Sequence, residues 1–514
     1  MKYVLKHYDD IREKVENLSV DELLKAVIMP NIILGYNEMP DDAVSVFLHP
    51  TTKQKAREAI EKMNGGRGVP ALVVSDMEHG AGGAITDANS AFPSMMASTV
   101  TGEEKYAYEM GVLAAKEARE AGYHWTFGPC VDILMNHSNP VVSIRTAGDN
   151  ADDVIQYGGA YMRGLQDTGL IATLKHFPGD GCDENDQHLA LTVNPLSQQE
   201  WDASFGRVYS TLIEQGAMAV MPGHISLPSY DEPDENGICP PATVSKKLLT
   251  DLLRNKIGFD GIIVSDGANM GGFCGYRNMY EAAAMFLEAG GDCLIFIHAT
   301  PEYLGEMKKH IASGILSMES LKNRAYRMMC FARHYFEMHD ANETVKSDVE
   351  YTCAIAREIA EKSIEIDYDR VDLLPYDIQK DTRIAHIILA NPGMPMDAAE
   401  AFTAALKELS DNVTELSDPG PDKLHKLAKN GEYDLIICSV IAGASWGLNT
   451  CKLAGRVARN MMWGWTRMGV PALFVNFYSP YFKEQYIASV DTNVNTYGYT
   501  KHTIPALIKK ITGK

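Results

Sequence analysis

Short apolar runs rich in β-branched residues alternate with longer amphipathic segments over the first two thirds of the chain. The runs follow one another at intervals of roughly 30–50 residues, so each interval has room for a helix and a loop. They are Ala71–Ser75, Trp125–Phe127, Ile171–Leu174, Ala217–Met221, Gly261–Ser265 and Cys293–Phe296, with an earlier candidate near Val27–Leu34. Apolar runs separated by amphipathic helices, such as the one expected over Ala107–Ala121, indicate parallel strands in βα units. The pattern predicts an α/β fold, a (β/α)8 TIM-type barrel that includes an irregular strand.

A second α/β pattern follows a charged, helical stretch over Leu316–Glu365. Around Ile366–Asp381 the composition changes to Asp, Tyr and Pro, and new strand candidates then alternate with helices such as Ala398–Leu409. The candidates are Ile384–Ala390, Tyr433–Val440, Pro471–Phe477 and Asp491–Tyr497. This pattern predicts a smaller, doubly wound αβα sandwich domain. We therefore expect a catalytic barrel over residues 1–345, a connector over 346–380 and the sandwich domain over 381–514.

Composition and charge narrow the function classes. The chain has 514 residues, of which 47 are Lys or Arg and 68 are Asp or Glu, so its net charge is −21. Such an acidic chain is not expected to bind nucleic acid or an anionic membrane, which attract basic surfaces. Its first residues contain no apolar stretch typical of a secretory signal, and its nine cysteines include no CxxC pair. These features predict a cytoplasmic protein with reduced thiols and no cofactor or metal, and they make no prediction about its oligomeric state.

Polar residues follow four of the predicted barrel strands. They form the segments Asp76–Gly80 (DMEHG), Lys175–Gly179 (KHFPG), Pro222–His224 (PGH) and Asp266–Gly267. In a barrel of this kind catalytic groups come from the carboxyl ends of the strands. A single Asp after a strand is more often a helix cap or a solvated carboxylate. Four such strand ends that meet at one mouth indicate a ligand site, because unpaired charges there are costly.

The segment Lys175–His188 holds the highest density of candidate chemistry. Two glycines and a proline make it a loop, and Asp186 stands two residues before His188. A bent loop can bring this carboxylate onto one imidazole nitrogen, which orients the ring and leaves the other nitrogen to exchange a proton. The alternative is a solvated acidic loop without a catalytic role.

The loop Lys175–His188 together with Ile262–Asp266 resembles the K-H-F-P-G-[D/H]-G-x4-D-x-H and S-D motifs of glycoside hydrolase family 3, in its β-N-acetylglucosaminidase branch. Further segments are similar to the family's D-x-E-G-G, W-x-F-x-P-x-x-D and M-x-x-H motifs and to a turn of its two-domain members. These are, in order, Asp76–Gly80, Trp125–Asp132, Met221–His224 and Asn476–Tyr481.

The resemblance implies a retaining exo-glycosidase that acts on small carbohydrates with terminal β-linked N-acetylglucosamine or N-acetylhexosamine. It makes Asp266 the nucleophile and His188 the general acid and base, with Asp186 as the partner of His188. Retaining glycosidases usually place two carboxylates about 5 Å apart, whereas here a His–Asp pair replaces one of them. The resemblance implies five sugar ligands: Asp76, Arg145, Lys175, His176 and His224. For His224, a structural role in packing near the barrel mouth is an equally good interpretation.

The sequence departs from the family pattern at three positions. Asp180 stands where many members have His, Gln187 where Ser or Thr is usual, and His79 where the family has Gly. Asp180 is expected to change the polarity of the loop. Gln187 and His79 are expected to border the substrate and to affect the preference for the leaving group.

Other functions stay open at this point. The β-glucosidase branch of the family generally lacks the D-x-H loop and takes its acid/base from the second domain. A phosphorylase is a further alternative, because a His acid/base makes the site less anionic than Glu does and lets phosphate compete with water. A metal-dependent hydrolase would use His176, His188, His224 and Asp266, but the first strand carries no HxH pair. A non-enzymatic sugar-binding protein is the remaining class, and no GxGxxG follows a strand of the second domain to suggest a dinucleotide site.

Overall fold

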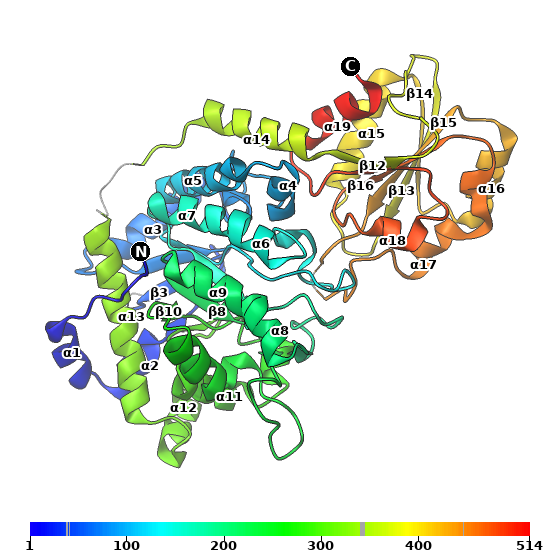
Figure 1. The fold of residues 1–514 in the computed structure, drawn as a ribbon. Helices are drawn as coiled ribbons and strands as arrows, with labels where there is room; N and C mark the ends of the chain where they lie inside the picture. Colours follow the sequence, from blue (N-terminus) through cyan, green and yellow to red (C-terminus); the bar gives the residue numbers. More distant parts are fainter. Residues whose placement is uncertain (38–39, 41, 340–344, 446) are drawn as a thin grey trace. The chain divides into compact units, whose positions relative to one another are not determined.

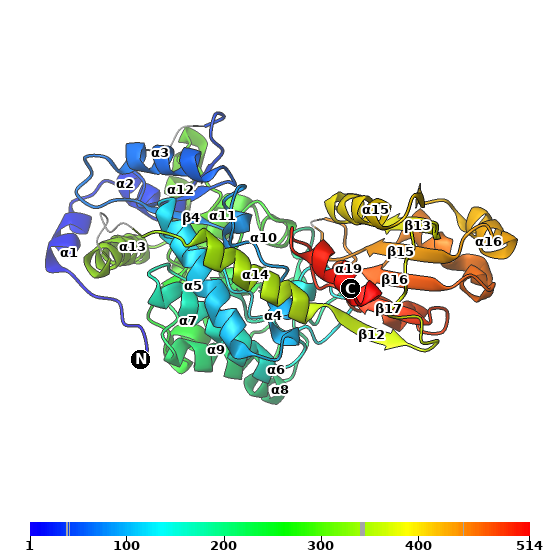
Figure 2. The same ribbon diagram turned by 90° about the horizontal axis from the view of Figure 1, so that it is seen from above.

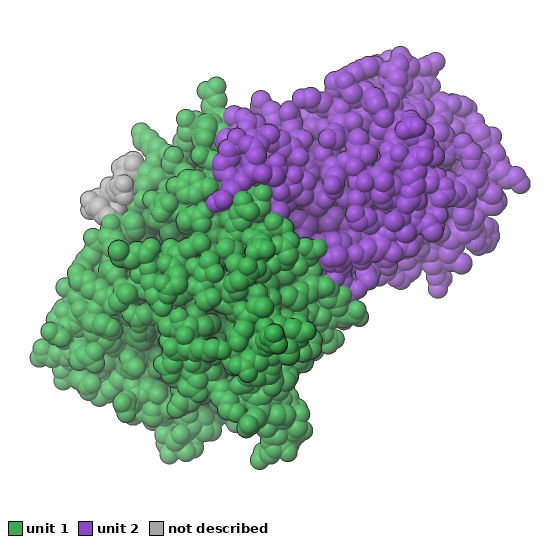
Figure 3. Space-filling model, in the orientation of Figure 1, with its two compact units in different colours: residues 1–91, 107–136, 146–352 green, residues 92–106, 137–145, 353–514 purple. Residues whose placement is uncertain are grey.

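The computed structural model describes residues 1–37, 40, 42–339, 345–445 and 447–514. The chain forms two compact units, drawn in different colours in Figure 3. The first unit comprises residues 1–91, 107–136 and 146–352, and the second comprises residues 92–106, 137–145 and 353–514. Both have mixed α/β content with parallel strands (Figure 1). The domain limits expected from the sequence stay a prediction.

Parallel pairing connects the strands of the first unit into a ring. The paired groups are β2–β3–β4–β5, β6–β8–β10 and β1–β11. Parallel bridges Trp125–Ile171 and Val264–Cys293 join these groups, and β1 and β2 are consecutive pieces of one irregular strand, so the pairing returns to its start. The strands are β1 (Ile28–Met29), β2 (Asn31–Ile32), β3 (Ser45–Leu48), β4 (Leu72–Ser75), β5 (Trp125–Thr126), β6 (Thr173–Phe177), β8 (Ala219–Pro222), β10 (Ile262–Ile263) and β11 (Leu294–Ile295). A closed parallel ring of this kind is what a (β/α)8-type barrel requires.

Helices follow most of these strands along the chain (Figure 1). They begin where the local sequence offers a cap. Before α8, for example, Ser197 and Glu200 form a reciprocal capping box. The helices are α1 (Asp9–Glu16), α2 (Val20–Ala26), α3 (Lys53–Asn64), α5 (Glu104–Glu120), α6 (Ala151–Asp153), α7 (Gly159–Asp167), α8 (Gln198–Ala203), α9 (Phe205–Glu214), α10 (Gly271–Cys274), α11 (Met279–Ala289), α12 (Pro301–Ser313) and α13 (Met318–Met338), with π-helical segments Val154–Gly158 and Lys247–Lys256, 3-10 turns Ala81–Gly83 and Ala242–Val244, and the short parallel pair β7 (Thr192–Val193) and β9 (Ile225–Ser226).

Aromatic rings from strands that are not neighbours meet inside this ring of strands. The ring of Phe47, in β3, lies 5.7 Å from that of Phe127 and 5.1 Å from that of Phe296, measured between centroids. Phe127 follows β5 and Phe296 follows β11, and neither strand pairs with β3. Side chains from non-adjacent strands can touch only across the interior, so Phe47 points into the barrel.

The second unit is built on a six-stranded sheet with the order β12–β17–β16–β15–β13–β14. Only the β12–β17 pair is antiparallel. The strands are β12 (Glu365–Asp369), β13 (Arg383–Ala390), β14 (Asn412–Ser417), β15 (Leu435–Ile441), β16 (Ala472–Asn476) and β17 (Thr492–Asn495). The helices and turns of this unit are α4 (Met95–Val100), α14 (Val349–Ser363), α15 (Asp397–Leu409), α16 (Pro421–Asn430), α17 (Gly455–Ala458), α18 (Phe482–Tyr486), α19 (Thr503–Thr512) and the 3-10 segments Ser143–Arg145 and Arg459–Arg467; α5 and α14 each run from one unit into the other.

Alternate side chains of β13 enter two separate cores, one on each face of this sheet. Ile384 and Ile388 pack with residues of α14, α15 and α19, whereas Ile387 packs on the other face with residues of α16 and the Arg459–Arg467 segment. This alternation is the period of two that a strand imposes on its side chains. The unit is therefore a sheet between two helical layers, seen edge-on in Figure 2.

Two further sequence expectations concern the environment of the protein. Within the described residues no helix has the length and apolarity needed to cross a membrane. All nine cysteines lie in the described part of the chain and none of them forms a disulfide. The cytoplasmic location stays a prediction.

Candidate active site

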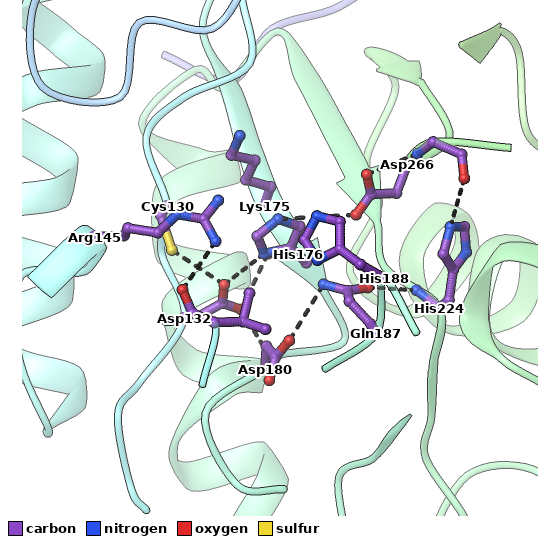
Figure 4. A network of polar contacts seen from close by, with 12 residues as sticks. Cys130, Asp132, Arg145, Lys175, His176, Asp180, Gln187, His188, His224 and Asp266 are labelled. Carbon is purple, nitrogen blue, oxygen red and sulfur yellow. Dashed lines mark hydrogen bonds and ion pairs between the residues drawn. The ribbon is translucent and has the colours of Figure 1, made fainter. Parts of the chain in front are cut away.

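The predicted site residues of the first unit lie at the carboxyl ends of its strands. Lys175 and His176 are in β6, while Asp76, His224 and Asp266 follow β4, β8 and β10. Because β6, β8 and β10 pair in parallel, their carboxyl ends share one edge of the ring. Figure 4 shows the ring of His176 directed toward the carboxylate of Asp266, with Lys175 beside it.

His176 stands between two carboxylates (Figure 4). Its Nδ1 lies 2.7 Å from Oδ2 of Asp132, and its Nε2 lies 3.9 Å from Oδ2 of Asp266. Asp132 is fully buried, and the side chain of His176 is nearly so. Asp132 thus holds the ring by Nδ1, and Nε2 is the atom that faces Asp266.

The carboxylate of Asp132 accepts four hydrogen bonds. Its Oδ1 accepts the backbone N–H of His176 at 3.0 Å and that of Asp180 at 2.7 Å. Its Oδ2 accepts Nδ1–H of His176 and the thiol of Cys130, the latter at 3.1 Å. Burial raises the pKa of Asp132, but His176 and these hydrogen bonds outweigh it and the pKa lies below its ordinary value. Asp132 is therefore ionised and fixes the orientation of His176.

Asp266 is the carboxylate at the end of β10, and its side chain is 14% exposed. Its Oδ1 accepts the backbone N–H of Gly267 at 2.7 Å. Burial raises the pKa of Asp266, but the neighbouring imidazoles, His176 first, hold the pKa below its ordinary value. The group is thus a charged, partly exposed carboxylate, which is the form that a nucleophile needs.

Lys175 forms a second charged cluster beside this pair. Its Nζ lies 2.6 Å from Oε1 of Glu78 and 3.2 Å from Oδ1 of Asp76. The Lys175 side chain is only 5% exposed, whereas that of Asp76 is 48% exposed. Lys175 therefore holds Asp76 in place while the Asp76 carboxylate stays accessible to a ligand.

The loop after β6 turns at two glycines. Gly179 and Gly181 have φ of +124° and +103°, in the left-handed region that other residues rarely adopt. A Cβ at Gly179 would lie 2.1 Å from Cδ1 of Phe205, and one at Gly181 would lie 2.1 Å from the carbonyl oxygen of Ile133. The spacing of these two glycines is therefore a steric requirement of the turn that precedes Asp186 and His188.

Asp186 and His188 form the contact that their spacing predicts. Nδ1 of His188 lies 2.6 Å from Oδ1 of Asp186, and the same oxygen accepts the His188 backbone N–H at 2.8 Å. Asp186 is buried and the His188 side chain is 23% exposed. Since a carboxylate only accepts, the proton on Nδ1 is fixed there and Nε2 is the atom that can exchange a proton with a ligand.

The backbone ties His188 to the segment that follows Asp266. The N–H of Gly271, at the start of α10, donates to the carbonyl of His188 at 2.8 Å, and that of Gly272 donates to Gln187 at 3.1 Å. A Cβ at Gly271 would lie 2.3 Å from the carbonyl oxygen of Leu189, so the two segments are in close contact. The segment that carries His188, the acid/base candidate, therefore packs against the segment that follows Asp266, the nucleophile candidate.

Gln187 differs from its expected position. We expected it to border the substrate, but its side chain is fully buried. Its Nε2 donates to Oδ2 of Asp180 at 3.2 Å and its Oε1 accepts the backbone N–H of His224 at 2.8 Å (Figure 4). Asp180 and Gln187 thus form an internal bridge between the His188 loop and the end of β8. His79, the other residue expected at the substrate, is half-buried.

His224 is enclosed by protein on both sides of its ring. Its Nε2 lies 3.0 Å from the carbonyl oxygen of Gly267, and its Nδ1 lies 3.1 Å from the hydroxyl of Thr243. The carbonyl can only accept, so Nε2 carries the proton and Nδ1 accepts from Thr243. Burial lowers the pKa of His224 to about 4. His224 is thus neutral and supports the turn after Asp266.

Arg145 belongs to the second compact unit, unlike the other predicted site residues. It ends the 3-10 turn Ser143–Arg145, and its Nη1 donates to the carbonyl of Val141 at 3.1 Å. Its role as a sugar ligand stays a prediction.

Three residues of the site went unrecognised as such in the sequence. Asp132, Glu78 and Cys130 all lie inside the motifs that carry the family resemblance, but spacing alone did not indicate their partners. Cys130, Asp132 and His176 are also the one group of three metal-ligating side chains that lie close together within the described residues. The oxygens of Asp132 already accept four hydrogen bonds there, so a cation would have to replace protons on His176 or Cys130. The expectation that no metal is needed stays a prediction.

A family model and a curated protein match the sequence of this chain. The family model described as Glycosyl hydrolase family 3 N terminal domain matches residues 11–330. A Cellulomonas fimi protein named beta-N-acetylglucosaminidase/beta-glucosidase is 31% identical over 504 residues, covering 94% of this chain and 88% of that protein.

Two solved structures resemble the chain over nearly its whole length. One is a beta-glucoside phosphorylase, with a TM-score of 0.87 and 28% identity over 98% of this chain and 93% of that chain. The other is a glycoside hydrolase family 3 beta-N-acetylglucosaminidase from Paenibacillus sp. str. FPU-7, with a TM-score of 0.81 over 96% of this chain and 97% of that chain. The second is 22% identical and bears on the fold alone.

Proposed function

The chain belongs to glycosyl hydrolase family 3, and from this premise we propose that it is a retaining exo-glycosidase that removes terminal β-linked N-acetylglucosamine. Family membership makes it a glycosidase of β-linked glycosides. The preference for the N-acetylated sugar is supported by the name of the Cellulomonas fimi relative and by the D-x-H loop. The observation that carries the proposal is the 2.6 Å contact between Asp186 and His188, which provides a proton donor in the barrel itself.

The proposed reaction has two steps. In the first, a carboxylate oxygen of Asp266 forms a bond to the anomeric carbon while the bond from that carbon to the leaving oxygen breaks. His188 gives its Nε2 proton to the departing oxygen. In the second, a water loses a proton to His188 and its oxygen attacks the anomeric carbon, which releases Asp266. Two inversions give net retention of the β configuration.

The remaining groups bind the sugar in this proposal. Asp76, held by Lys175, accepts from a sugar hydroxyl, and Lys175 and His176 donate to others. The resemblance adds Arg145 as a further ligand. His224, whose ring is enclosed, contributes through the Gly267 carbonyl and keeps the Asp266 turn in place. Hydrogen bonds of this kind lower the activation free energy only if they are stronger in the transition state than in the bound substrate.

The test is a comparison of three nitrophenyl substrates under identical conditions: the β-N-acetylglucosaminide, the β-N-acetylgalactosaminide and the β-glucoside. The proposal expects the highest kcat/KM with the N-acetylglucosaminide. A higher kcat/KM with the glucoside would move the chain to the β-glucosidase branch. Proton NMR of the sugar first formed tests the mechanism, because retention requires the β-anomer to precede the α-anomer.

Phosphorolysis is a second candidate, favoured by the similarity to the beta-glucoside phosphorylase. The electrostatics of the site are compatible with it. An imidazole that has given up its proton is neutral, so it does not repel phosphate as a glutamate would. Product analysis separates the two reactions, since phosphorolysis in phosphate buffer yields a sugar 1-phosphate and hydrolysis yields the free sugar in any buffer.

A further inference from the structure

Three polar side chains stand at the same barrel end as Asp76, on strands that the sequence motifs do not include. Asn31 lies in β2, His49 directly follows β3, and His298 follows β11. The register of β3 with β4 pairs Phe47 with Val74, and His49 and Asp76 are the residues two positions beyond this pair. The three residues therefore continue the row of strand ends beyond Asp76.

The side chains of Asn31 and His49 face the barrel interior. Asn31 is the cross-strand partner of Phe47, and His49 is two residues after it, so both share the inward direction of Phe47. The contacts of His49 agree with this direction. Its ring is edge-on to Phe47 at 5.2 Å and stacked on Phe296 at 6.3 Å, and both histidines and Asn31 are half-buried.

Asn31 fixes the tautomers of the two histidines. Its Nδ2 lies 3.3 Å from Nε2 of His49, and its Oδ1 lies 2.8 Å from Nε2 of His298. The amide nitrogen donates, so Nε2 of His49 accepts and its proton is on Nδ1. The amide oxygen accepts, so Nε2 of His298 donates and its Nδ1 carries a lone pair. Within the described residues neither Nδ1 atom makes a hydrogen bond.

The two imidazoles are neutral near pH 7. Burial lowers the pKa of His49, although Asp76 partly opposes this, and burial also lowers the pKa of His298. A neutral donor next to a neutral acceptor suits hydroxyl groups, which both donate and accept, better than it suits an anion or a cation. The three residues thus have the chemistry of a sugar-binding surface.

We propose that Asn31, His49 and His298 form a polar wall that binds hydroxyl groups of the terminal sugar other than the one at the anomeric carbon. The proposal rests on the glycosidase function proposed above and deepens it. Around the ring of strands, β11 and the β1–β2 strand separate β3, and with it His49, from β10, which precedes Asp266; Asn31 is on the β1–β2 strand, and His298 follows β11, the neighbour of β10. A sugar whose anomeric carbon faces Asp266 and which also reaches Asp76 turns its other hydroxyls toward this wall.

Deoxy substrates test the wall directly. The 3-, 4- and 6-deoxy analogues of the best nitrophenyl glycoside are compared in the wild type and in His49→Ala and His298→Ala. For the parent glycoside we expect each variant to lower kcat/KM by about 5- to 50-fold, the effect of losing a hydrogen bond in a partly buried site. For the one analogue that lacks the matching hydroxyl the loss should be less than about 2-fold, because the contact is already absent.

All substrates are compared with the same preparation of each variant. A partly unfolded variant would lose the same factor in kcat/KM on every substrate, so a folding defect is recognised as a uniform loss. Such a uniform loss, in both His→Ala variants and in His49→Gln, would overturn the proposal. His7→Ala, a change at an exposed histidine, serves as the control and should leave all ratios unchanged. A failure of the proposed function is seen with the wild type alone, which then prefers a glycoside of another sugar. In that case the deoxy analogues are made from the preferred sugar, so the wall is still tested.

Discussion

Nε2 of His176 lies 3.9 Å from Oδ2 of Asp266, so the candidate nucleophile faces an imidazole that a second, buried carboxylate holds by its other nitrogen. The Asp132–His176 contact is thus part of the electrostatics of Asp266, although Asp132 itself has no contact with the open side of the site. The neighbouring imidazoles, His176 first, hold the pKa of Asp266 below its ordinary value, so its carboxylate stays ionised; in the proposed mechanism the lower basicity would also make Asp266 a better leaving group in the second step.

Asp132→Asn should weaken catalysis and shift its pH dependence. Without the carboxylate of Asp132 the His176 ring is no longer held at Nδ1, so the contact that keeps the pKa of Asp266 low is weakened. The pKa of Asp266 then rises, so the acid limb of kcat/KM moves to higher pH, and at neutral pH kcat/KM falls by about 10- to 100-fold. Cys130→Ala is the matched control, since it removes only the thiol donor to the same oxygen. An unchanged acid limb in Asp132→Asn would contradict the role of this pair.

Asp266→Asn should abolish turnover while the protein stays folded. Removal of the nucleophile of a covalent mechanism costs about 10⁴-fold or more in kcat. The measurement is kcat on a nitrophenyl glycoside, with circular dichroism to verify the fold. Asp251→Asn, at an exposed aspartate of the same unit, should retain wild-type activity. Activity of the Asp266 variant within about 10-fold of the wild type would exclude it as the nucleophile.

His188→Ala should affect substrates according to their leaving groups. A nitrophenol departs with little protonation, whereas an alkyl or sugar leaving group needs a proton, which His188 supplies in the proposed mechanism. The loss in kcat/KM should therefore be at least about 100-fold greater for the poor leaving group. Azide should partly restore the turnover of the nitrophenyl substrate, because it attacks the intermediate without a general base.

Asp186→Asn should follow the same pattern as His188→Ala, and the double variant should be little worse than either single one, because the pair acts as a unit. Equal, small effects on good and poor leaving groups would show that the proton comes from another group.

Chelation should leave the activity unchanged. The one close group of metal-ligating side chains in the described residues, Cys130, Asp132 and His176, is connected by hydrogen bonds that a cation would displace. We expect full kcat after dialysis against EDTA in the presence of a thiol reductant. Loss of activity in EDTA that zinc restores would instead assign a metal to this cluster.

His386 should make the second unit less stable in mild acid. Burial lowers its pKa to about 3, while its hydroxyl partners Thr403 and Ser439 satisfy the neutral ring. The unfolded chain binds a proton near pH 6.5 and the folded chain does not, so this stability is full above pH 6.5 and is lost as the pH falls toward 3. Between pH 7 and 5 the loss attributable to His386 is about 2 kcal/mol.

Chemical denaturation at the two pH values measures this contribution. The free-energy difference between the wild type and His386→Gln should be smaller at pH 5 than at pH 7 by about 2 kcal/mol. Leu406→Ala removes an apolar side chain of the same unit and should lower the stability equally at both pH values. A difference for His386→Gln that does not change with pH would show that the histidine titrates alike in both states.

The strands that the sequence revealed are those buried on both faces. The runs around β4, β8, β13, β15 and β16 are mostly apolar because helices or the barrel interior cover both of their sides. The pattern of apolar runs does not indicate β12 and β14, the edge strands of the second unit, because their residues are mostly polar and part-exposed. Nor does it indicate β3, a run of only four residues.

For the site, local spacing predicted a contact between neighbours but no contact across the barrel. Asp186 and His188 are two residues apart, and a bent loop is enough to join them. Asp132 and His176 are 44 residues apart, and only the neighbouring positions of the two chain segments in the barrel bring them together. Gln187 was expected at the substrate because it stands between two candidate catalytic residues, yet the turn points its amide inward, toward Asp180 and His224.

The pairing of β1 with β11 has a consequence for synthesis on the ribosome. Ile28 pairs with Leu294, so the ring of strands cannot close until the chain beyond Leu294 has left the exit tunnel. Until then the strands from β2 to β10 have two unpaired edges, and such edges favour association with other chains. Nascent chains of this protein should therefore depend on chaperones throughout most of translation, and a stalled product that ends before β11 should aggregate.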